Sequence, residues 1–342
     1  MPSQPHASAT PPLPATTPST SEQMSTTRPP SRLAVGVALA IVYVIWGSTY
    51  LAIRIVAASL PAFGSAALRF GIAAVLLLAA LVLVRGFRRL RVSWHELGAC
   101  AVVGVLLLAG GNGLVVLAES PQFALPSGVA ALVISLNPLI MVVLRTVSGD
   151  RPALGTVAGV VIGLAGLVAL FLPGLGGAGS DHPVPLTGGL LALGAVTCWC
   201  VGSFATRWLP MPADPFVATG YEMVAGAAAM ALIAVARGEP APWLVPHVPV
   251  TAWIALGYLI LAGSLVAFTA YIWLLHHAPI SLVSTYAYVN PVIAIALGVL
   301  FAGELLTGQV VLAAMTVVIG VVLVVSMERP GGTRRSVKKG TL

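Results

Sequence analysis

Apolar residues occur in long runs along most of the chain, and short segments rich in Gly, Pro and charged residues separate these runs. A helix needs about 20 predominantly apolar residues to cross the hydrocarbon core of a bilayer. Ten runs are close to this length, so the pattern predicts ten membrane-spanning helices. These spans 1 to 10 are expected at 33–54, 62–84, 97–118, 126–147, 154–172, 188–208, 215–236, 252–274, 280–301 and 309–327.

Composition indicates the same class. Of the 342 residues, 58% are hydrophobic and 8% are charged, and the mean hydropathy is +1.00. A soluble domain carries about 25% charged residues, so we expect an all-α integral membrane protein. A Pro/Ser/Thr-rich segment, 1–31, is predicted to be a disordered tail, and translation from Met1 or from Met24 fits the sequence equally. A basic tail, 327–342, follows the last span.

The basic residues predict an orientation. With the N-terminus in the cytoplasm, fourteen of the 17 Lys and Arg residues fall on the inner side, whereas Arg54 and Arg237 fall on the outer side. This bias follows the positive-inside rule, so both termini are predicted to be cytoplasmic in a multi-pass protein of the cell membrane. Nucleic acid is not an expected partner, because the basic residues lie in short loops and tails.

A repeat relates the two halves of the chain. A constant offset of about 153 residues aligns features in four regions without a gap. The aligned pairs are Trp46 with Trp199, Ala109-Gly110 with Ala262-Gly263, Pro126 with Pro279, and Asn137-Pro138 with Asn290-Pro291. Each copy holds five spans, an odd number, so the second copy enters the membrane from the opposite side. Inverted repeats of this kind are typical of secondary transporters that bind substrate between the repeats.

Short motifs in six of the spans resemble the EamA family of the drug/metabolite transporter superfamily, and within it the YedA-type exporters. They are WGSTYLAIR, RFGIAAVLLL, LAGGNGLVVLAE, PSGVAALVISLNPL, YEMVAGA and TYAYVNPVIAIALGVLFAGELLT. The resemblance covers about residues 34–326. It implies ten helices in two EamA repeats (32–172 and 186–326), an inner-membrane location, and export of metabolites, amino acids or drugs.

The two Asn-Pro pairs lie near the middle of spans 4 and 9. Proline removes a backbone donor and disturbs the preceding turn of a helix, and an Asn amide is costly in hydrocarbon unless it is satisfied. We therefore predict that Asn137 and Asn290 line a central cavity and that Pro138 and Pro291 act as hinges. The alternative is that they form two static kinks that only shape the bundle.

Two charged residues are expected deep in the membrane at aligned positions, Arg69 in span 2 and Glu222 in span 7. Intramembrane charges are costly and are candidates for function. Glu222 is predicted to line the cavity or couple transport to protons, and Arg69 to bind an anionic group or pair with Glu222. A structural ion pair is the alternative. Glu119, at the outer end of span 3, is a candidate for lining the exit, but a solvated acid at the end of a helix is the favoured expectation.

Further cavity candidates are polar or aromatic. Asn112 is flanked by glycines, which allow close approach of a substrate, although it could instead join helices. Trp46 and Trp199 lie too deep for an interfacial aromatic belt and are predicted cavity walls. Tyr271, Tyr286 and Tyr288 are related candidates. Of Tyr286 and Tyr288, which lie on opposite sides of a helix, we favour Tyr288.

The sequence therefore predicts a secondary active transporter that takes a small-molecule substrate, with protons as a candidate coupling ion. A passive exchanger, a channel or, least favoured, an intramembrane enzyme are the alternatives. No cofactor or metal site is expected, and no ATP-binding motif is present. The Gly155, Gly159 and Gly163 ridge is expected to pack within the chain or to support a homodimer.

Overall fold

The computed structural model describes residues 31–149, 151–176 and 184–327. Both tails, 1–30 and 328–342, lie outside the described residues, so the predictions about them stay predictions. The described part is helical and contains no strand. Its helices are α1 (Arg32–Ala57), α2 (Ala62–Arg85), α3 (Trp94–Gly104), η2 (Val105–Asn112), α4 (Gly113–Glu119), α5 (Ser127–Ile134), α6 (Asn137–Val147), α7 (Leu154–Gly176), α8 (Leu186–Ala205), α9 (Pro215–Ala236), α10 (Val250–Tyr258), η4 (Leu259–Val266), α11 (Ala267–His277), α12 (Ile280–Val283), α13 (Tyr286–Ala302) and α14 (Gly308–Met327), with short 3-10 turns η1 (Phe87–Leu90) and η3 (Pro242–Leu244).

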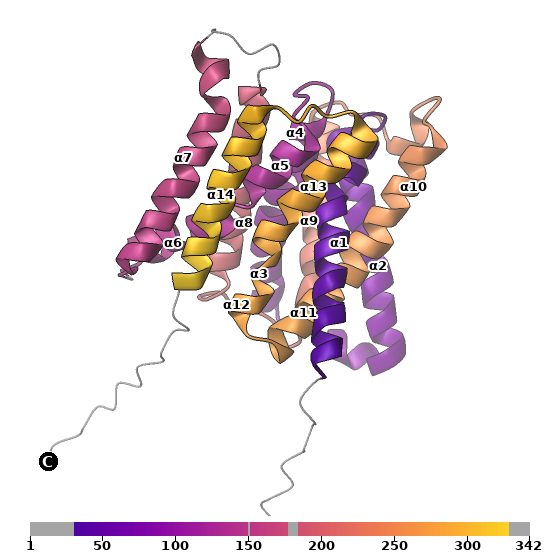
Figure 1. The fold of residues 1–342 in the computed structure, drawn as a ribbon. Helices are drawn as coiled ribbons and strands as arrows, with labels where there is room; N and C mark the ends of the chain where they lie inside the picture. Colours follow the sequence, from indigo (N-terminus) through magenta and orange to yellow (C-terminus); the bar gives the residue numbers. More distant parts are fainter. Residues whose placement is uncertain (1–30, 150, 177–183, 328–342) are drawn as a thin grey trace, which may run out of the picture.

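These helices form the expected membrane spans. Among the described residues, nine helical segments are long and apolar enough to cross a membrane, and α13 is a tenth, shorter apolar helix of 17 residues. Span 9 is interrupted because a turn at Ser284–Thr285 separates α12 from α13. The first residue of α1 and the last residue of α14 lie at the same, lower end of the bundle in Figure 1, as an even number of crossings requires.

The two repeats interlock rather than sit side by side as separate bundles. Helix α1 of repeat 1 packs against α13 and α11 of repeat 2, and α8 of repeat 2 packs reciprocally against α5, α6 and η2 of repeat 1. Helices α2 and α9, equivalent in the two repeats, pack against each other. Helices α7 and α14 form a further pair at one edge (Figure 1). The cavity between the repeats is therefore walled by equivalent elements of both.

The glycine ridge of α7 is occupied within the chain. A Cβ on Gly159 would come 2.8 Å from the carbonyl oxygen of Gly320 in α14, and a Cβ on Gly155 would come 3.1 Å from the side chain of Met327. Gly163 is covered by Leu139. Small residues let helix backbones approach closely, so this ridge serves the contacts of α7 with α14 and α6.

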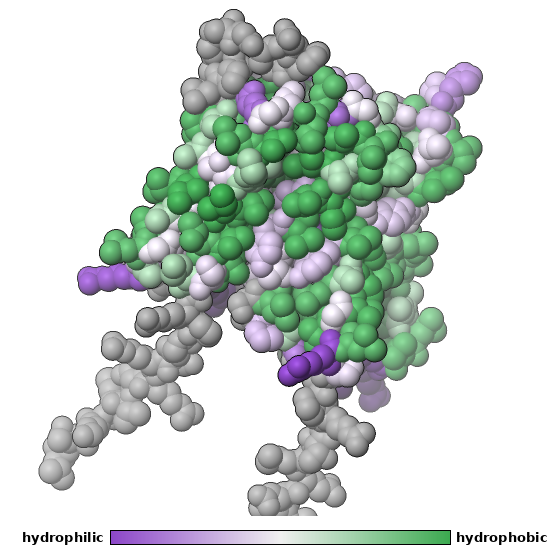
Figure 2. All heavy atoms as spheres, viewed as in Figure 1, coloured by the Kyte–Doolittle hydropathy of each residue, from purple (hydrophilic) through white to green (hydrophobic). Residues whose placement is uncertain are grey.

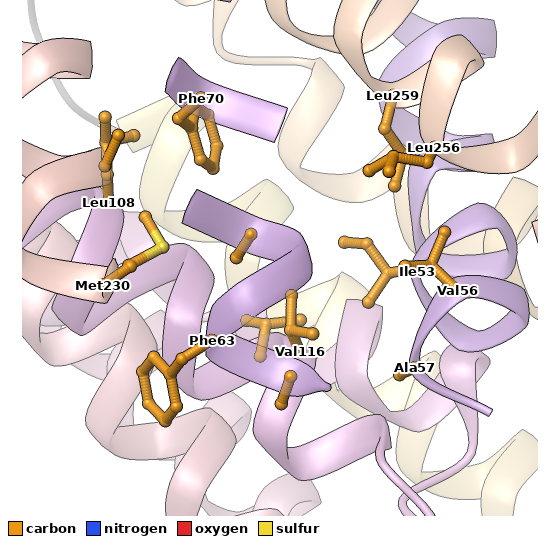
Figure 3. Close-up of a cluster of buried hydrophobic side chains, with 14 of the residues drawn as sticks. Ile53, Val56, Ala57, Phe63, Phe70, Leu108, Val116, Met230, Leu256 and Leu259 are labelled. Carbon is orange, nitrogen blue, oxygen red and sulfur yellow. The ribbon is translucent and has the colours of Figure 1, made fainter. Parts of the chain in front are cut away.

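The outer surface and the interior are both apolar. Leu83 and Leu154 are 86% and 89% exposed, and apolar side chains cover most of the face in Figure 2, with the strongly hydrophilic ones near the helix ends. Such a surface suits lipid and not water. Inside, Phe63, Phe70 and Met230 belong to a cluster between α2, α4, η2 and α9 (Figure 3).

Candidate substrate cavity

A cavity of about 160 Å³ lies at the interface of the two repeats. A protein cavity of about 150 Å³ can hold a molecule of the size of benzene, so a small molecule fits. Most of the predicted residues line it: Trp46, Arg69, Asn112, Asn137, Trp199, Asn290 and Pro291. The lining also includes residues that the sequence did not single out, namely Thr49, Tyr50, Phe70, Ser135, Ser264 and Phe268, and it includes Tyr286.

The two tryptophans occupy equivalent places in opposite repeats. Trp46 of α1 donates from Nε1 to the carbonyl oxygen of Gly263 in η4, at 3.4 Å. Trp199 of α8 packs over Gly111 in η2, where a Cβ would come 3.1 Å from its ring. Each tryptophan of one repeat thus packs on the third span of the other. Trp46 also contacts the rings of Tyr271 and Tyr286, with centroids 5.0 and 5.2 Å apart.

Both third spans contain a π-helical segment beside the cavity. These are η2 (Val105–Asn112) and η4 (Leu259–Val266), which the sequence did not predict. Their starting residues are separated by nearly the repeat offset. Widened turns of this type are frequent at functional sites. They bring Gly111, Asn112 and Ser264 to the cavity wall. The shared Ala-Gly pair was the one sequence signal at these places.

The Asn-Pro pairs adopt different structures in the two repeats. In repeat 1 the chain turns at Ser135 and Leu136, and Pro138 lies in the first turn of α6, where a missing donor is tolerated. In repeat 2 Pro291 lies inside α13, and the turn comes earlier, at 284–285. The expectation of two equivalent mid-helix kinks was therefore wrong for Pro138, which begins a helix. Asn290 is buried, and its Oδ1 has no hydrogen-bond partner among the described residues.

Arg69 is the one residue with a full charge among the described residues that line the cavity. The residue is 6% exposed, and its Nε donates to Ser264 Oγ at 3.0 Å. The guanidinium carbon lies 4.6 Å from the centre of the Phe70 ring. Nη1 is buried without a hydrogen-bond partner. The structure thus brings a guanidinium into an otherwise uncharged wall.

Glu222 does not line the cavity, contrary to the prediction. Its neighbour Met223 does, and successive helical residues point about 100° apart. The Glu222 side chain is half-buried beside α3, whose Gly104 lies so close that a Cβ there would come 2.2 Å from the Glu222 carbonyl oxygen. Among the described ion pairs none joins Glu222 to Arg69, so the expected pair is absent.

Tyr288 is also outside the cavity lining, and Tyr286 takes that place. Tyr286 and Asn290 are four residues apart on α13, so they share the face that points into the cavity. The preference for Tyr288 was therefore wrong. Tyr288 instead packs against the hydrophobic cluster formed around α5, α7 and α14.

Glu119 is buried and not solvated, contrary to the expectation. The residue is 4% exposed, and neither carboxylate oxygen has a hydrogen-bond partner among the described residues. It lies within electrostatic range of Arg54 and Glu304, and of the cavity-lining Tyr50. Unsatisfied buried polar groups are few in native proteins, and each calls for an explanation. Glu119 is therefore a second acid, besides Glu222, with a candidate role in transport.

A polar contact, which we call the Glu304 latch, joins the segment after α13 to α5 and α1 beyond the cavity. The Glu304 carboxylate accepts hydrogen bonds from Ser127 N and Ser127 Oγ, both at 2.6 Å, and from Gly128 N at 3.1 Å. Arg54 Nη1 lies 3.2 Å from the same carboxylate. Ser127 begins α5, where free backbone donors and the helix dipole favour an anion. Ala131, one helical turn along α5, already lines the cavity.

The latch has no equivalent at the other end of the bundle. The offset of 153 residues places Arg207 opposite Arg54 and Arg151 opposite Glu304, and two cations cannot form the same contact. Polar contacts therefore differ between the two ends of the bundle: the Glu304 latch joins α1 and α5 at one end, and Arg85 of α2 pairs with Asp214 before α9 at the other.

Two segments of the chain, 34–172 and 186–326, match the family model described as the EamA-like transporter family. The chain belongs to this family. The predicted resemblance is thereby confirmed, and so is the predicted all-α membrane fold built from two EamA repeats. The EamA repeats account for every residue of the cavity and of the Glu304 latch.

The relatives of this EamA protein carry the name of a transporter or of a protein family. It is 36% identical over 287 residues to the inner membrane transporter YedA of Escherichia coli, covering 84% of this chain and 89% of YedA. It is 27% identical over 279 residues to a WAT1-related protein of Arabidopsis thaliana, covering 80% and 65%. A solved crystal structure has the same fold, with a TM-score of 0.57 and 27% identity over 86% of this chain and 96% of that one.

Proposed function

We propose that this EamA protein is a secondary active transporter that exports small metabolites, amino acids or drugs by alternating access. The observation that carries the proposal is the cavity itself, which lies between inverted repeats and is walled by reciprocal contacts of Trp46 and Trp199. Because the repeats are inverted, exchanging their conformations moves the opening from one face to the other.

The two repeats differ in conformation, as expected for one of the two states of an alternating-access cycle. The interrupted span of repeat 1 turns directly before Asn137, whereas that of repeat 2 turns more than one helical turn before Asn290. An exchange of these two conformations would require release of the Glu304 latch. With the predicted topology, in which both termini are cytoplasmic and the protein is in the cell membrane, the latch closes the outer side and the described conformation precedes outward opening.

A passive exchanger is the second candidate, and one observation favours it. No acidic residue is among the described residues that line the cavity, so no carboxylate is in direct contact with the substrate site to carry a coupling proton. Glu119, which interacts electrostatically with the cavity-lining Tyr50 and with Glu304 and Arg54 of the latch, is a candidate for coupling in an active transporter.

Flux measurements in proteoliposomes test the proposal. A transporter shows saturable flux that substrate on the far side accelerates, and the active form accumulates substrate against a gradient when a pH gradient is imposed. Asn112→Leu, which removes a polar group from the cavity, is expected to reduce flux strongly. Thr197→Ala is the matched control, because Thr197 is exposed on α8, two residues from Trp199. Flux that rises linearly with concentration and shows no acceleration would indicate a channel.

A further inference from the structure

We propose that Arg69 forms a subsite for a carboxylate, so that the transported molecule is a small organic anion with an apolar body. The inference rests on the proposed function and specifies its substrate class. It begins with how the Arg69 side chain is held. Ser264 Oγ accepts from Arg69 Nε and donates to the Leu259 carbonyl oxygen at 3.0 Å. The serine is thus fixed with its lone pair toward the guanidinium.

Two further residues, Gly263 and Phe70, contact the Arg69 guanidinium. Gly263 lies against it, and a Cβ there would come 3.3 Å from Nη2. The Phe70 ring covers one side of the group at 4.6 Å. Nε is therefore used, whereas Nη1 is buried without a hydrogen-bond partner among the described residues. The remaining donors are the forked pair of a guanidinium that binds a carboxylate in a bidentate manner.

The charge of Arg69 is unbalanced in the described structure. A buried charge without a partner is strongly unfavourable in a membrane protein, where such residues pair with one another or mark a substrate pathway. Glu222, the acid expected to neutralise it, lies outside the cavity lining, and no acid is among the described lining residues. A carboxylate entering the cavity would supply the missing counter-charge.

The rest of the lining defines what accompanies the carboxylate. Trp46, Trp199, Phe268 and Tyr286 provide aromatic surface for an apolar body. Asn290 Oδ1 is a buried acceptor without a partner, so it can accept a hydrogen bond from an N–H or O–H group of the substrate. The cavity thus offers a donor without a partner, Arg69 Nη1, and an acceptor without a partner, Asn290 Oδ1, among the described residues. The first can bind an acceptor group of the substrate, and the second can bind a donor group. Together they favour an amphipathic carboxylate with one further donor group.

The test is equilibrium binding to purified protein in detergent, which does not depend on transport. The probes are three carboxylates paired with their neutral amides: acetate with acetamide, hexanoate with hexanamide, and phenylacetate with phenylacetamide, at constant ionic strength. Charge-assisted hydrogen bonds favour the carboxylate, so at least one pair should show about tenfold or greater preference for it. Equal binding of every pair, or no binding by any carboxylate, would overturn the proposal.

Variants assign the preference to the side chain. Arg69→Met should remove it, Arg69→Lys should retain part of it because the charge remains without the fork, and Ser264→Ala should weaken it. Arg207→Met is the matched control, since Arg207 also lies over a phenylalanine ring, Phe204 at 4.4 Å, but outside the cavity lining. Arg69→Met removes no ion pair, so a monodisperse elution profile and retained melting temperature are expected; a preference that survives in this folded variant would refute the subsite.

Two outcomes separate this inference from related ones. Displacement of the bound carboxylate by equimolar chloride, at fixed ionic strength, would show a site for small inorganic anions and would contradict the carboxylate assignment. Carboxylate binding that depends on Arg69 in a protein without saturable flux would overturn the proposed function and leave the subsite intact. Saturable flux with no carboxylate preference would overturn the subsite and leave the proposed function intact.

Discussion

The Glu304 latch gives the sharpest prediction about the transport cycle. Glu304→Gln keeps the size of the side chain and removes its charge, so the variant tests the contact without opening a cavity. The carboxylate accepts three hydrogen bonds from Ser127 and Gly128 and faces Arg54. A Gln amide has one acceptor oxygen, and its NH2 group would oppose one of these donors.

The magnitude follows from these contacts. Losing one charge-assisted hydrogen bond costs about 1.5–3 kcal/mol. The Arg54 ion pair adds less than about 1 kcal/mol, because the Arg54 side chain is 33% exposed and solvent screens it. A loss of about 2 kcal/mol in the closed conformation alone raises the ratio of open to closed molecules about 30-fold.

Distances between two spin labels measure this ratio. Labels at Gln122 and Leu305, both exposed and on either side of the latch, report the separation of α5 and α13 after the three native cysteines are replaced. Glu304→Gln should convert a mainly short distance into a mixture with a longer one. Glu96→Gln is the matched control, because partly buried Glu96 also caps a helix, α3, and Gln preserves such a cap. An unchanged distance distribution in a folded Glu304→Gln protein would refute the gating role.

Three further predictions concern other parts of the mechanism. Replacing Pro138 and Pro291 with Ala should slow saturable flux at least several-fold without loss of folding, chiefly because Pro291→Ala restores a backbone donor inside α13, whereas Pro138 lies in the first turn of α6; wild-type flux would show that the prolines are only architectural. Glu119→Leu removes a buried carboxylate without partners, so it should raise the melting temperature by a few degrees in thermal unfolding and reduce accumulation driven by a pH gradient; a less stable protein with normal accumulation would contradict both claims. Gly159→Leu forces a side chain into the α7–α14 contact, where a Cβ alone would come 2.8 Å from a backbone oxygen, and should lower the melting temperature by several degrees; an unchanged value would show that the two helices can separate.

The sequence predicted the spans, the repeat and much of the cavity for one reason. Membrane length and the absence of charge determine where helices cross, and a constant offset then places equivalent residues at equivalent depths. Trp46 and Trp199 could be found in this way, as could Asn137 and Asn290. The symmetry argument fixes depth along the membrane normal and leaves the rotation of each helix undetermined.

The wrong predictions arise from that missing rotation. Glu222 and Arg69 align in sequence, yet only Arg69 lines the cavity, because the direction of a side chain depends on the packing of α9 against α3 and α2. For the same reason Tyr286 lines the cavity in place of Tyr288, which the sequence had favoured. The π-helical segments η2 and η4 shift the helical register within their spans, and no composition signal marks them beyond glycines. Gly110 and Gly111 of η2 permit close contact with Cys198 and Trp199, and Gly263 of η4 with Thr49.

Glu119 and the Glu304 latch depend on contacts between the repeats. Glu304 and Ser127 are 177 residues apart in the chain, so neither periodicity nor the repeat offset relates them. Both acids follow or end apolar helices, where a solvated position is the ordinary expectation. Their burial is a consequence of how α5, α13 and α1 meet.

The most direct test of alternating access is whether the cavity opens to one side at a time. A single cysteine at Ser135, which lines the cavity, can be labelled with a membrane-impermeant maleimide from either face of sealed vesicles after the native cysteines are removed. The account predicts that Glu304→Gln increases labelling from the face opposite the termini and decreases labelling from the other face by a corresponding fraction. Labelling that rises from both faces together would show a continuous pore and contradict the account.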